Sequence, residues 1–425
     1  MRAIGSRGQL ALEGGEPAVR QAVPPMYPGG LRIGREEEEA VLQVLRSKRL
    51  FRYYGPGTGT SKVQELEKAF AEYMGVGHSL AVASGTLALT AALAALEVGP
   101  GDEVIVPAYT WISTPAAVAA VGAVPVIAEV DSSLTLDPAA VESRLTPRTR
   151  AIVAVHMRGA PCHMDALMSV SERSGVAVLE DVAQACGGSF RGRRLGSIGQ
   201  MGAFSLQYTK AITCGDGGMV TTSDRRCYDR AQMYHDVVAS QRADLPPEEL
   251  VLGIGCRMPE LLGAVAGVQL TRLDGLLADL RIRNAAVRAG IADVAQSKGL
   301  ELRAANDLDG DIGIALVCFL PTAERAGYVA KALHAEGVPS GLLFSRDQPD
   351  YHIYYHWTPI LAKQTWSRLG PWSWPGADVR YDREMCPRTL DLLGRAVQVH
   401  VSPDLSAQNV EEIVEGLNKV LSAAL

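Results

Sequence analysis

The sequence lacks several features that would assign a class of protein at once. Its 425 residues include seven cysteines, and no two of them form a CxxC pair; they stand at positions 162, 186, 214, 227, 256, 318 and 386. Neither a zinc knuckle nor a disulfide framework is therefore expected, we expect no metal site, and the thiols fit a reducing cytoplasm. The net charge is −6 and the basic residues are scattered, so a nucleic acid is not an expected partner.

Long apolar runs are missing too. Residues 1–25 contain no apolar core of a signal peptide, and the weakly polar run at 113–130 is interrupted by Ser, Thr, Pro and Glu. We therefore expect a cytoplasmic protein without a membrane span. What is present is a globular composition, with 47% hydrophobic and 21% charged residues. The length allows two domains, or one large α/β domain with a smaller partner.

Short apolar runs alternate with helical segments in the first half of the chain. The runs cover 79–83, 103–107, 124–130, 151–156 and 176–181, and the helical segments begin at Leu87, Thr110, Asp137 and Asp165. This alternation predicts parallel strands with crossover helices, so we expect an α/β fold with a mostly parallel, doubly wound sheet. Two amphipathic helices, 36–48 and 61–75, are predicted before the first strand.

Domain limits follow from the same pattern. Residues 1–35 are rich in Gly and Pro and predict an irregular arm, and 36–275 predict the large domain. A helical stretch at 258–295 leads out of it. Further strands are expected at 313–321, 339–344 and 396–401, with helices at 322–336 and from 405 onward. These predict a small α+β C-terminal domain, 276–425, with an insertion at 345–390.

Polar and aromatic residues follow the first two predicted strands. Gly85 and Thr86 lie in a Ser-Gly-Thr turn that opens an Ala- and Leu-rich helix. A helix N-terminus presents free N–H groups and can bind a phosphate, although Ser84 or Thr86 could equally be a simple helix cap. Trp111 follows the second strand, where its ring could stack on a flat ligand or belong to the core.

An acid and a lysine stand at later strand ends. Asp181 could pair with a cationic nitrogen, or could be a helix N-cap with Gln184 closing a capping box. Lys210 could be an ordinary solvated lysine or, if buried, a residue for Schiff-base chemistry. A phosphate turn, an aromatic ring, an acid and a lysine follow in order along one sheet. Pyridoxal 5'-phosphate (PLP) requires this set of groups.

Several stretches between about residue 50 and residue 275 carry a family resemblance. They include SGTLAL, GDEVIVPAYTWIST, GAVPVIAEVD, the block beginning LEDVAQACGG, and RMPELLGAVAGVQLTRLD. In this order they resemble the DegT/DnrJ/EryC1/StrS aminotransferases, PLP enzymes of fold type I that aminate keto sugars and keto cyclitols. The resemblance implies an amino acid donor, Glu or Gln, and ping-pong transfer to a keto acceptor.

The resemblance also implies residue roles. Lys210 would form the internal aldimine, Asp181 would pair with the pyridine nitrogen and Trp111 would stack on the ring. The phosphate would be held by Gly85, Thr86 and Ser205, and Gln184 would lie near the 3-hydroxyl. Family members are usually homodimers with shared active sites, so a homodimer is expected.

The insertion is expected to hold the acceptor. Its polar aromatic cluster would suit a polyhydroxylated substrate, although such a cluster can also be mere packing; its members are His352, Tyr354, Tyr355, His356 and Trp357. Two other functions stay open at this point. One is a PLP enzyme of elimination or decarboxylation, and the other is a non-catalytic PLP-binding paralogue.

Three features depart from the family pattern. Gly255 stands where members commonly lend an Asn to the partner's cofactor phosphate, and Cys186 stands where a His is frequent. The segment 345–380 also differs from the members that act on sugar nucleotides, and the stretches FRYYGP, HMRG, AITCG and HIYYHW resemble a subgroup that includes 8-amino-octulosonate transaminases. These differences leave the acceptor and the cross-subunit phosphate contact open.

Overall fold

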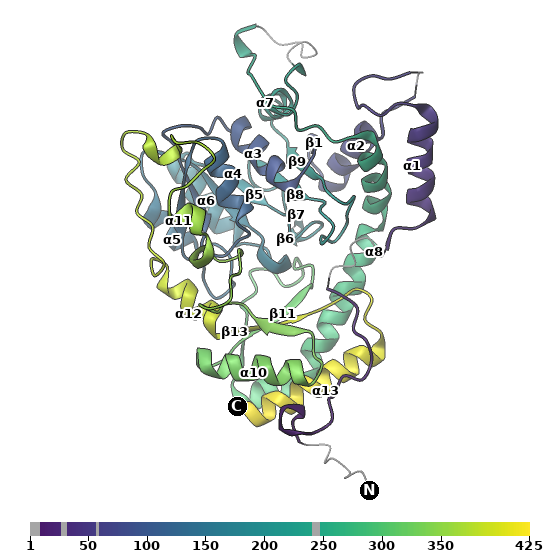
Figure 1. The fold of residues 1–425 in the computed structure, drawn as a ribbon, viewed down its shortest axis with the longest axis vertical. Helices are drawn as coiled ribbons and strands as arrows, with labels where there is room; N and C mark the ends of the chain where they lie inside the picture. The colour runs from purple at the N-terminus through teal and green to yellow at the C-terminus, as the bar shows by residue number, and fades with distance from the viewer. Residues whose placement is uncertain (1–8, 27–31, 57–58, 240–246) are drawn as a thin grey trace.

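A computed structural model describes residues 9–26, 32–56, 59–239 and 247–425 (Figure 1). Its larger sheet has seven strands: β1 (His78–Val82), β2 (Glu103–Pro107), β3 (Val124–Ala128), β4 (Thr149–Val155), β5 (Ala177–Asp181), β8 (Met201–Ser205) and β9 (Gly218–Thr222). Their order is β1-β9-β8-β5-β4-β2-β3. The pairs from β8 to β3 are parallel, whereas β9 is antiparallel to both neighbours. The predicted mostly parallel α/β fold is confirmed.

Crossover helices cover the sheet, as the alternating pattern predicts. They are α3 (Gly85–Ala95), α4 (Ser113–Ala120), α5 (Pro138–Arg144) and α6 (Met164–Ser174). The predicted start of a helix at Thr110 is wrong, because the backbone N–H groups of Thr110 and Ile112 donate to carbonyls of the insertion at 2.8 and 2.9 Å. These bonds hold the loop against the insertion, and α4 begins at Ser113.

Strand β9 was not predicted. It returns antiparallel beside β8 after the glycine-rich segment, and its residues pair with β1, where Thr222 lies opposite His78. All five residues of β9 are buried. The β8–β9 connection is consequently a long loop at the sheet edge, and Lys210 lies within it.

A second sheet forms the small C-terminal unit. Its strands are β10 (Glu301–Leu302), β11 (Ala315–Phe319), β12 (Ser340–Leu342) and β13 (Ala396–His400), in the order β10-β11-β13-β12 with antiparallel pairing. Helices α10 (Ala323–Ala335) and α13 (Ala407–Ala424) lie on the side away from the large sheet (Figure 1). The predicted small α+β unit is confirmed.

One long helix connects the two units. Helix α8 (Glu260–Gly290) runs without interruption past residue 275, and α9 (Ala292–Lys298) follows after a break at Ile291. The domain limits 1–35, 36–275 and 276–425 remain predictions. The arm before residue 27 runs along the small unit, where the buried Glu336 carboxylate accepts from the N–H groups of Ala11 and Ala18 at 2.8 and 2.9 Å.

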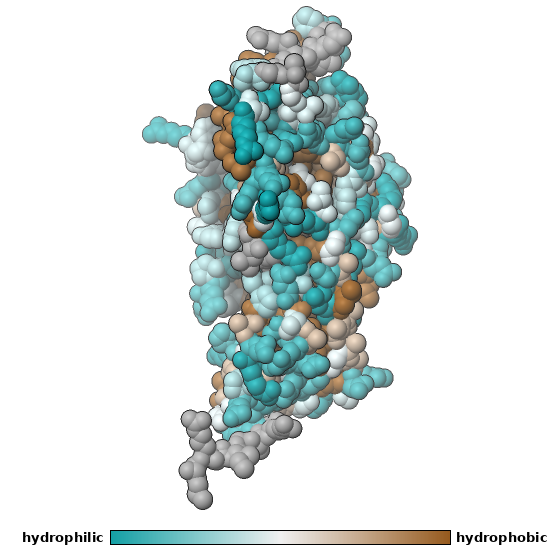
Figure 2. Space-filling model, turned by 90° about the vertical axis from the view of Figure 1, so that its right-hand side faces the viewer, coloured by the Kyte–Doolittle hydropathy of each residue, from teal (hydrophilic) through white to brown (hydrophobic). Residues whose placement is uncertain are grey.

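Helix α8 is also long and apolar enough to cross a membrane by length and composition. One helix of this length and composition is weak evidence for a membrane span, because the core helices of soluble proteins can be equally long and apolar. In the structure it packs against α1 (Arg35–Ser47), α2 (Lys62–Met74) and α13. The face that carries α1 shows hydrophilic residues with separate hydrophobic patches over its described part (Figure 2). This arrangement fits a core helix.

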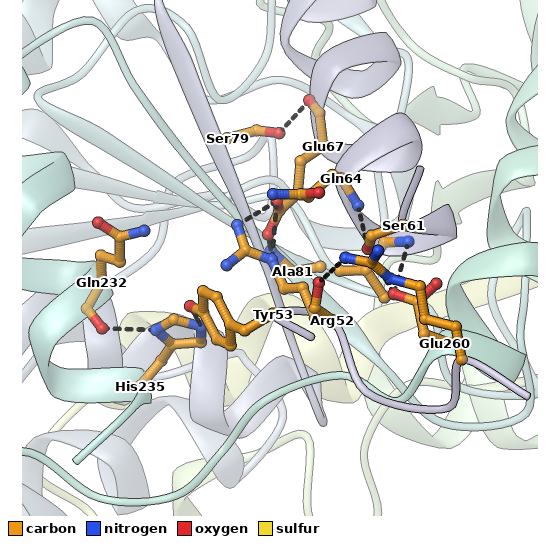
Figure 3. Close-up of polar contacts among 12 residues, drawn as sticks. Arg52, Tyr53, Ser61, Gln64, Glu67, Ser79, Ala81, Gln232, His235 and Glu260 are labelled. Carbon is orange, nitrogen blue, oxygen red and sulfur yellow. Dashed lines mark hydrogen bonds and ion pairs between the residues drawn. The ribbon is translucent and has the colours of Figure 1, made fainter. Parts of the chain in front are cut away.

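A buried ion pair ties the loop after α1 to the large sheet (Figure 3). Arg52 is 3% exposed, and its Nε donates to Glu67 on α2 at 3.1 Å. The other carboxylate oxygen of Glu67 accepts from the N–H of Ala81 in β1 at 2.9 Å. Since Ser84 follows β1 within three residues, this network helps to fix the turn where α3 begins.

A second contact in Figure 3 joins the same loop to α7 (Arg225–His235). Nδ1 of His235 lies 2.6 Å from the Gln232 carbonyl and therefore carries the hydrogen. The Tyr53 hydroxyl then donates to Nε2 at 3.1 Å. Burial lowers the pKa of His235 to about 4, so the ring is neutral in this contact.

Candidate active site

A cavity of about 570 Å³ lies at the carboxyl ends of β4, β5 and β8. Ligands of open α/β sheets bind at this edge. The cavity is lined by seven of the predicted site residues, namely Gly85, Thr86, Trp111, Asp181, Gln184, Ser205 and Lys210, and by His352 from the insertion. Residues that are far apart in the sequence thus meet around one space.

The N-terminus of α3 forms one end of the cavity. Ser84 caps it by accepting from the N–H of Leu87 at 3.2 Å, and the N–H groups of Gly85 and Thr86 precede the first intrahelical bond. A side chain at Gly85 would place its Cβ 2.6 Å from Cβ of Ser205. The absence of a side chain at Gly85 therefore keeps the space between the helix end and β8 open, and this space suits a phosphate.

Trp111 is 44% exposed and lines the cavity, so it does not belong to the core. Its ring centroid lies 4.8 Å from that of His352. The backbone contacts between the loop at 110–112 and the insertion hold both rings at the cavity wall.

Asp181 is buried at the end of β5. Its Oδ2 accepts from Thr114 Oγ1 at 2.8 Å and its Oδ1 accepts from the N–H of Ala183 at 3.1 Å. Burial raises the pKa of Asp181, and these two hydrogen bonds and the charge of Lys210 oppose the rise. A cation beside the carboxylate would therefore be favourable. The described chain has no α-helix at 182–188, so the N-cap interpretation is wrong.

The neighbouring Glu180 points to the other face of β5 and has a structural role. Its carboxylate accepts from the N–H groups of Gly196, Ile198 and Gly199 at 2.7 to 2.8 Å. It also accepts from Nε2 of the buried His156 at 3.0 Å. These contacts hold the loop that leads into β8. They also satisfy the Glu180 carboxylate, which explains how two adjacent acids, Glu180 and Asp181, can be buried at the end of β5.

Gln184 contacts the segment after β4. Its Oε1 accepts from the backbone N–H of Arg158 at 3.1 Å, so it does not close a capping box. Cys186 is buried, and burial raises the pKa of its thiol to about 12. The thiol is therefore neutral and is not among the residues that line the cavity.

Lys210 lies in the β8–β9 loop, half-buried at the cavity. Burial lowers the pKa of Lys210; Asp181 opposes this shift and Arg158 adds to it. The loop is closed by hydrogen bonds from Leu206 N–H to Gly217 and from Tyr208 N–H to Gly215, and Gly215 has a φ of +92°. A partly desolvated amine on a closed loop is suited to nucleophilic chemistry.

The insertion contributes less than expected. His352 lines the cavity, whereas Tyr354 and His356 are not among its lining residues. The Tyr354 hydroxyl donates to the Arg383 carbonyl at 2.6 Å, and His356 Nε2 contacts the Ser345 carbonyl at 3.0 Å. The aromatic cluster therefore serves mainly as packing, and Tyr355 and Trp357 belong to it too.

Other lining residues were missed. Thr110, Thr114, Gln207, Thr209 and Asp216 all border the cavity. The hydroxyls of the stretch PAYTWIST, which follows β2, were the available signal for Thr114. Gly255, by contrast, lies in a segment beside β1, where the carbonyl of Cys256 accepts from the N–H of Ala83.

The fold and the site define an α/β enzyme of fold type I, with a lysine, a buried carboxylate and a helix N-terminus around one cavity. The model of the DegT/DnrJ/EryC1/StrS aminotransferase family matches residues 31–368. The chain belongs to this family, and the predicted aminotransferase is confirmed.

Known proteins support the assignment. The L-glutamine:2-deoxy-scyllo-inosose aminotransferase of Streptomyces lividus is 41% identical over 292 residues, covering 66% of this chain and 68% of that protein. The GDP-perosamine synthase of Caulobacter vibrioides is 40% identical over 219 residues, covering 51% and 58%. The crystal structure of 3-amino-5-hydroxybenzoic acid synthase has a TM-score of 0.78 at 28% identity and covers 94% and 100%.

These relatives correct one expectation. Five of the similar proteins are named L-glutamine:2-deoxy-scyllo-inosose aminotransferases. The expected closeness to the octulosonate subgroup is therefore not supported. Its short motifs lie in the loop after α1, the β4 turn, the β8–β9 loop and the insertion, which are too few positions to define a subgroup.

Proposed function

We propose that this aminotransferase uses PLP to move the amino group of L-glutamine to the keto group of a cyclitol. The observation that carries the proposal is the meeting of Lys210 and Asp181 in one cavity that ends at the N-terminus of α3. The donor and acceptor classes follow from the relatives, whose names give L-glutamine and 2-deoxy-scyllo-inosose.

The residues present fit PLP. The space that a Cβ at Gly85 would fill suits the phosphate; Ser205 lies beside this space, and Thr86 lines the same cavity. The buried Asp181 carboxylate suits a protonated pyridine nitrogen, and the exposed face of Trp111 suits stacking. Gln184 would contact the ring near its 3-hydroxyl. When bound, the cofactor supplies an electron sink for the carbanion that forms at the donor carbon.

The chain's own groups would perform the remaining work. Lys210 would hold the cofactor covalently and, once displaced by the donor, its amine would move a proton between the donor carbon and the cofactor. The lowered pKa of Lys210 favours this role, because a larger share of the amine is neutral near pH 7. Asp181 would keep its charge beside the ring nitrogen throughout.

A homodimer with shared active sites is part of the proposal. Gly255 leaves room at the position of the family Asn, since the nearest atom to a Cβ there is an Arg257 nitrogen at 3.7 Å. We infer that the phosphate depends more on α3 and Ser205 of its own subunit than on the partner. Gly255→Asn should therefore change PLP affinity by no more than about threefold, as a titration would measure.

The test is a two-part reaction with the purified protein and PLP. We expect L-glutamine alone to convert the cofactor to its amine form with release of an oxo acid, and 2-deoxy-scyllo-inosose to return it to the aldehyde form. Lys210→Ala should abolish both the absorbance of the bound cofactor and turnover. Lys331→Ala, which changes an exposed lysine on α10, is the matched control.

The same assay separates the alternatives. An elimination or decarboxylation enzyme would release ammonia or carbon dioxide without leaving the cofactor in its amine form. A non-catalytic paralogue would bind PLP and leave L-glutamine unchanged. Either result would contradict the proposed transamination.

A further inference from the structure

Two buried hydroxyl groups form a chain that ends at the Asp181 carboxylate, and the roles above do not use them. Thr110 and Thr114 are each 1% exposed, and both line the cavity. Their hydroxyl oxygens lie 2.8 Å apart. Thr114 Oγ1 lies in turn 2.8 Å from Oδ2 of Asp181 and donates to it. The two threonines are thus connected in series to the acid.

The carboxylate fixes the direction of this chain. An ionised carboxylate only accepts hydrogen bonds, so the single hydroxyl hydrogen of Thr114 belongs to the contact with Asp181. The Thr114 oxygen then accepts, and Thr110 is the donor in the contact between the two hydroxyls. Because hydrogen bonds in series polarise one another, Thr110 strengthens the bond that Thr114 makes to the acid.

Backbone contacts hold both ends of the chain in place. The N–H of Thr110 donates to the His352 carbonyl of the insertion at 2.8 Å, and Thr114 lies in the first turn of α4. At the acid, Oδ1 of Asp181 accepts from the N–H of Ala183 at 3.1 Å. Each carboxylate oxygen therefore has one donor at a fixed position, which sets the plane of the carboxylate and leaves further lone pairs for a ligand.

We propose that Thr114, supported by Thr110, is a positioning residue that keeps the Asp181 carboxylate ionised and directed at the ring nitrogen of PLP. This rests on the proposed function. Burial raises the pKa of Asp181, and the hydrogen bond from Thr114 opposes the rise, because it favours the charged form. A hydrogen bond to a buried charged group is stronger than one between neutral groups, so the loss of this hydroxyl should reach the cofactor.

The experiment compares the binding of two ligands to the full-length apoenzyme. One is pyridoxamine 5'-phosphate, and the other is its 1-deaza analogue, in which a CH group replaces the ring nitrogen. Neither forms a covalent bond with Lys210, so a fluorescence titration gives a Kd for each. We expect Thr114→Val to raise the Kd of pyridoxamine 5'-phosphate by about tenfold. The Kd of the deaza analogue should change by less than about threefold, because it has no ring nitrogen for Asp181 to bind.

Further variants complete the design. Thr114→Ser keeps the hydroxyl and should restore the Kd to within about threefold of the wild-type value. Thr110→Val should raise the Kd of pyridoxamine 5'-phosphate by about threefold, and adding it to Thr114→Val should cause no further loss, because Thr110 acts through Thr114. Thr221→Val is the matched control: Thr221 is a buried threonine of β9 whose hydroxyl donates to the Gly196 carbonyl at 2.6 Å. It should leave the ratio of the two Kd values unchanged.

The outcomes are distinct, and urea denaturation of each apoenzyme checks that the variants are folded. Equal losses for both ligands in Thr114→Val, unchanged Kd values, or no recovery in Thr114→Ser would each overturn the positioning role while transamination stands. If the wild-type apoenzyme prefers pyridoxamine 5'-phosphate but the loaded enzyme does not convert L-glutamine, the proposed function fails and the positioning role stands. If the wild-type apoenzyme binds neither ligand, both fail.

Discussion

The buried pair of Arg52 and Glu67 allows the sharpest test of how the sheet supports the site. Glu67 is 6% exposed and accepts from Arg52 and from the N–H of Ala81 (Figure 3). Replacing Glu67 by Gln removes the negative charge and leaves the Arg52 guanidinium uncompensated among buried groups. Breaking a buried pair in this way lowers the free energy of unfolding by about 3 to 5 kcal/mol. We expect a value near the lower end, because Gln can still accept from Ala81.

A double-mutant cycle isolates the interaction. Arg52→Met should lower the free energy of unfolding by about as much as Glu67→Gln, because it leaves the Glu67 carboxylate without its cationic partner. The double variant Arg52→Met/Glu67→Gln removes both charges, so its loss should be smaller than the sum of the two by about 2 kcal/mol or more. Since Ala81 leads to the Ser84 turn, both single variants should also hold PLP more weakly.

Urea denaturation followed by tryptophan fluorescence measures these free energies of unfolding. The control is Glu72→Gln on the same helix, whose contact with Lys68 at 3.9 Å is exposed. That change should cost less than about 1 kcal/mol. If Glu67→Gln costs no more than Glu72→Gln, or if the cycle is additive within about 0.5 kcal/mol, the pair does not stabilise the loop and the reasoning is refuted.

Three further predictions concern the cavity. Asp181→Asn should retain PLP but slow the donor half-reaction by about 100-fold or more in stopped-flow absorbance, and an unchanged rate would place the carboxylate elsewhere. Gly85→Ala should raise the Kd for PLP by about tenfold in a titration, and adding Ser205→Gly should recover part of the loss, because the new Cβ lies 2.6 Å from Ser205. Attachment of PLP to the apoenzyme should quicken as pH rises through the lowered pKa of Lys210 and level off below the ordinary 10.5. The neutral amine is the nucleophile, so a midpoint at 10.5 or above would contradict the burial of Lys210.

The parts of the fold that could be predicted are those with a local signal. The strands at 79–83, 103–107 and 176–181 are short apolar runs, and β1, β2 and β5 lie there within one or two residues. Strand β9 follows a glycine cluster and is defined by pairing with β1, about 140 residues earlier. The late start of α4 has a similar origin, since it depends on contacts with the insertion. Partners this distant leave no periodic pattern in the sequence.

The site shows the same division. Asp181 and Lys210 could be placed because carboxyl ends of parallel strands meet at one edge. Asp216, which also lines the cavity, could not be placed, because its position depends on the return of the chain along β9. Tyr354 and His356 were assigned to a substrate pocket from their chemistry, but in the structure their polar atoms contact backbone carbonyls. Residue type alone does not distinguish a ligand contact from a satisfied packing contact.

The charges around the cavity form a connected set. Burial lowers the pKa of Lys210; Arg158 adds to this shift and Asp181 opposes it. A protonated pyridine nitrogen beside Asp181 would offset the carboxylate charge, so the opposition to the lowered pKa of Lys210 would weaken once the cofactor is bound. A larger share of the Lys210 amine would then be neutral, and the neutral amine is the form that accepts a proton from the donor carbon. The carboxylate that holds the cofactor would thus also set the protonation state of the base.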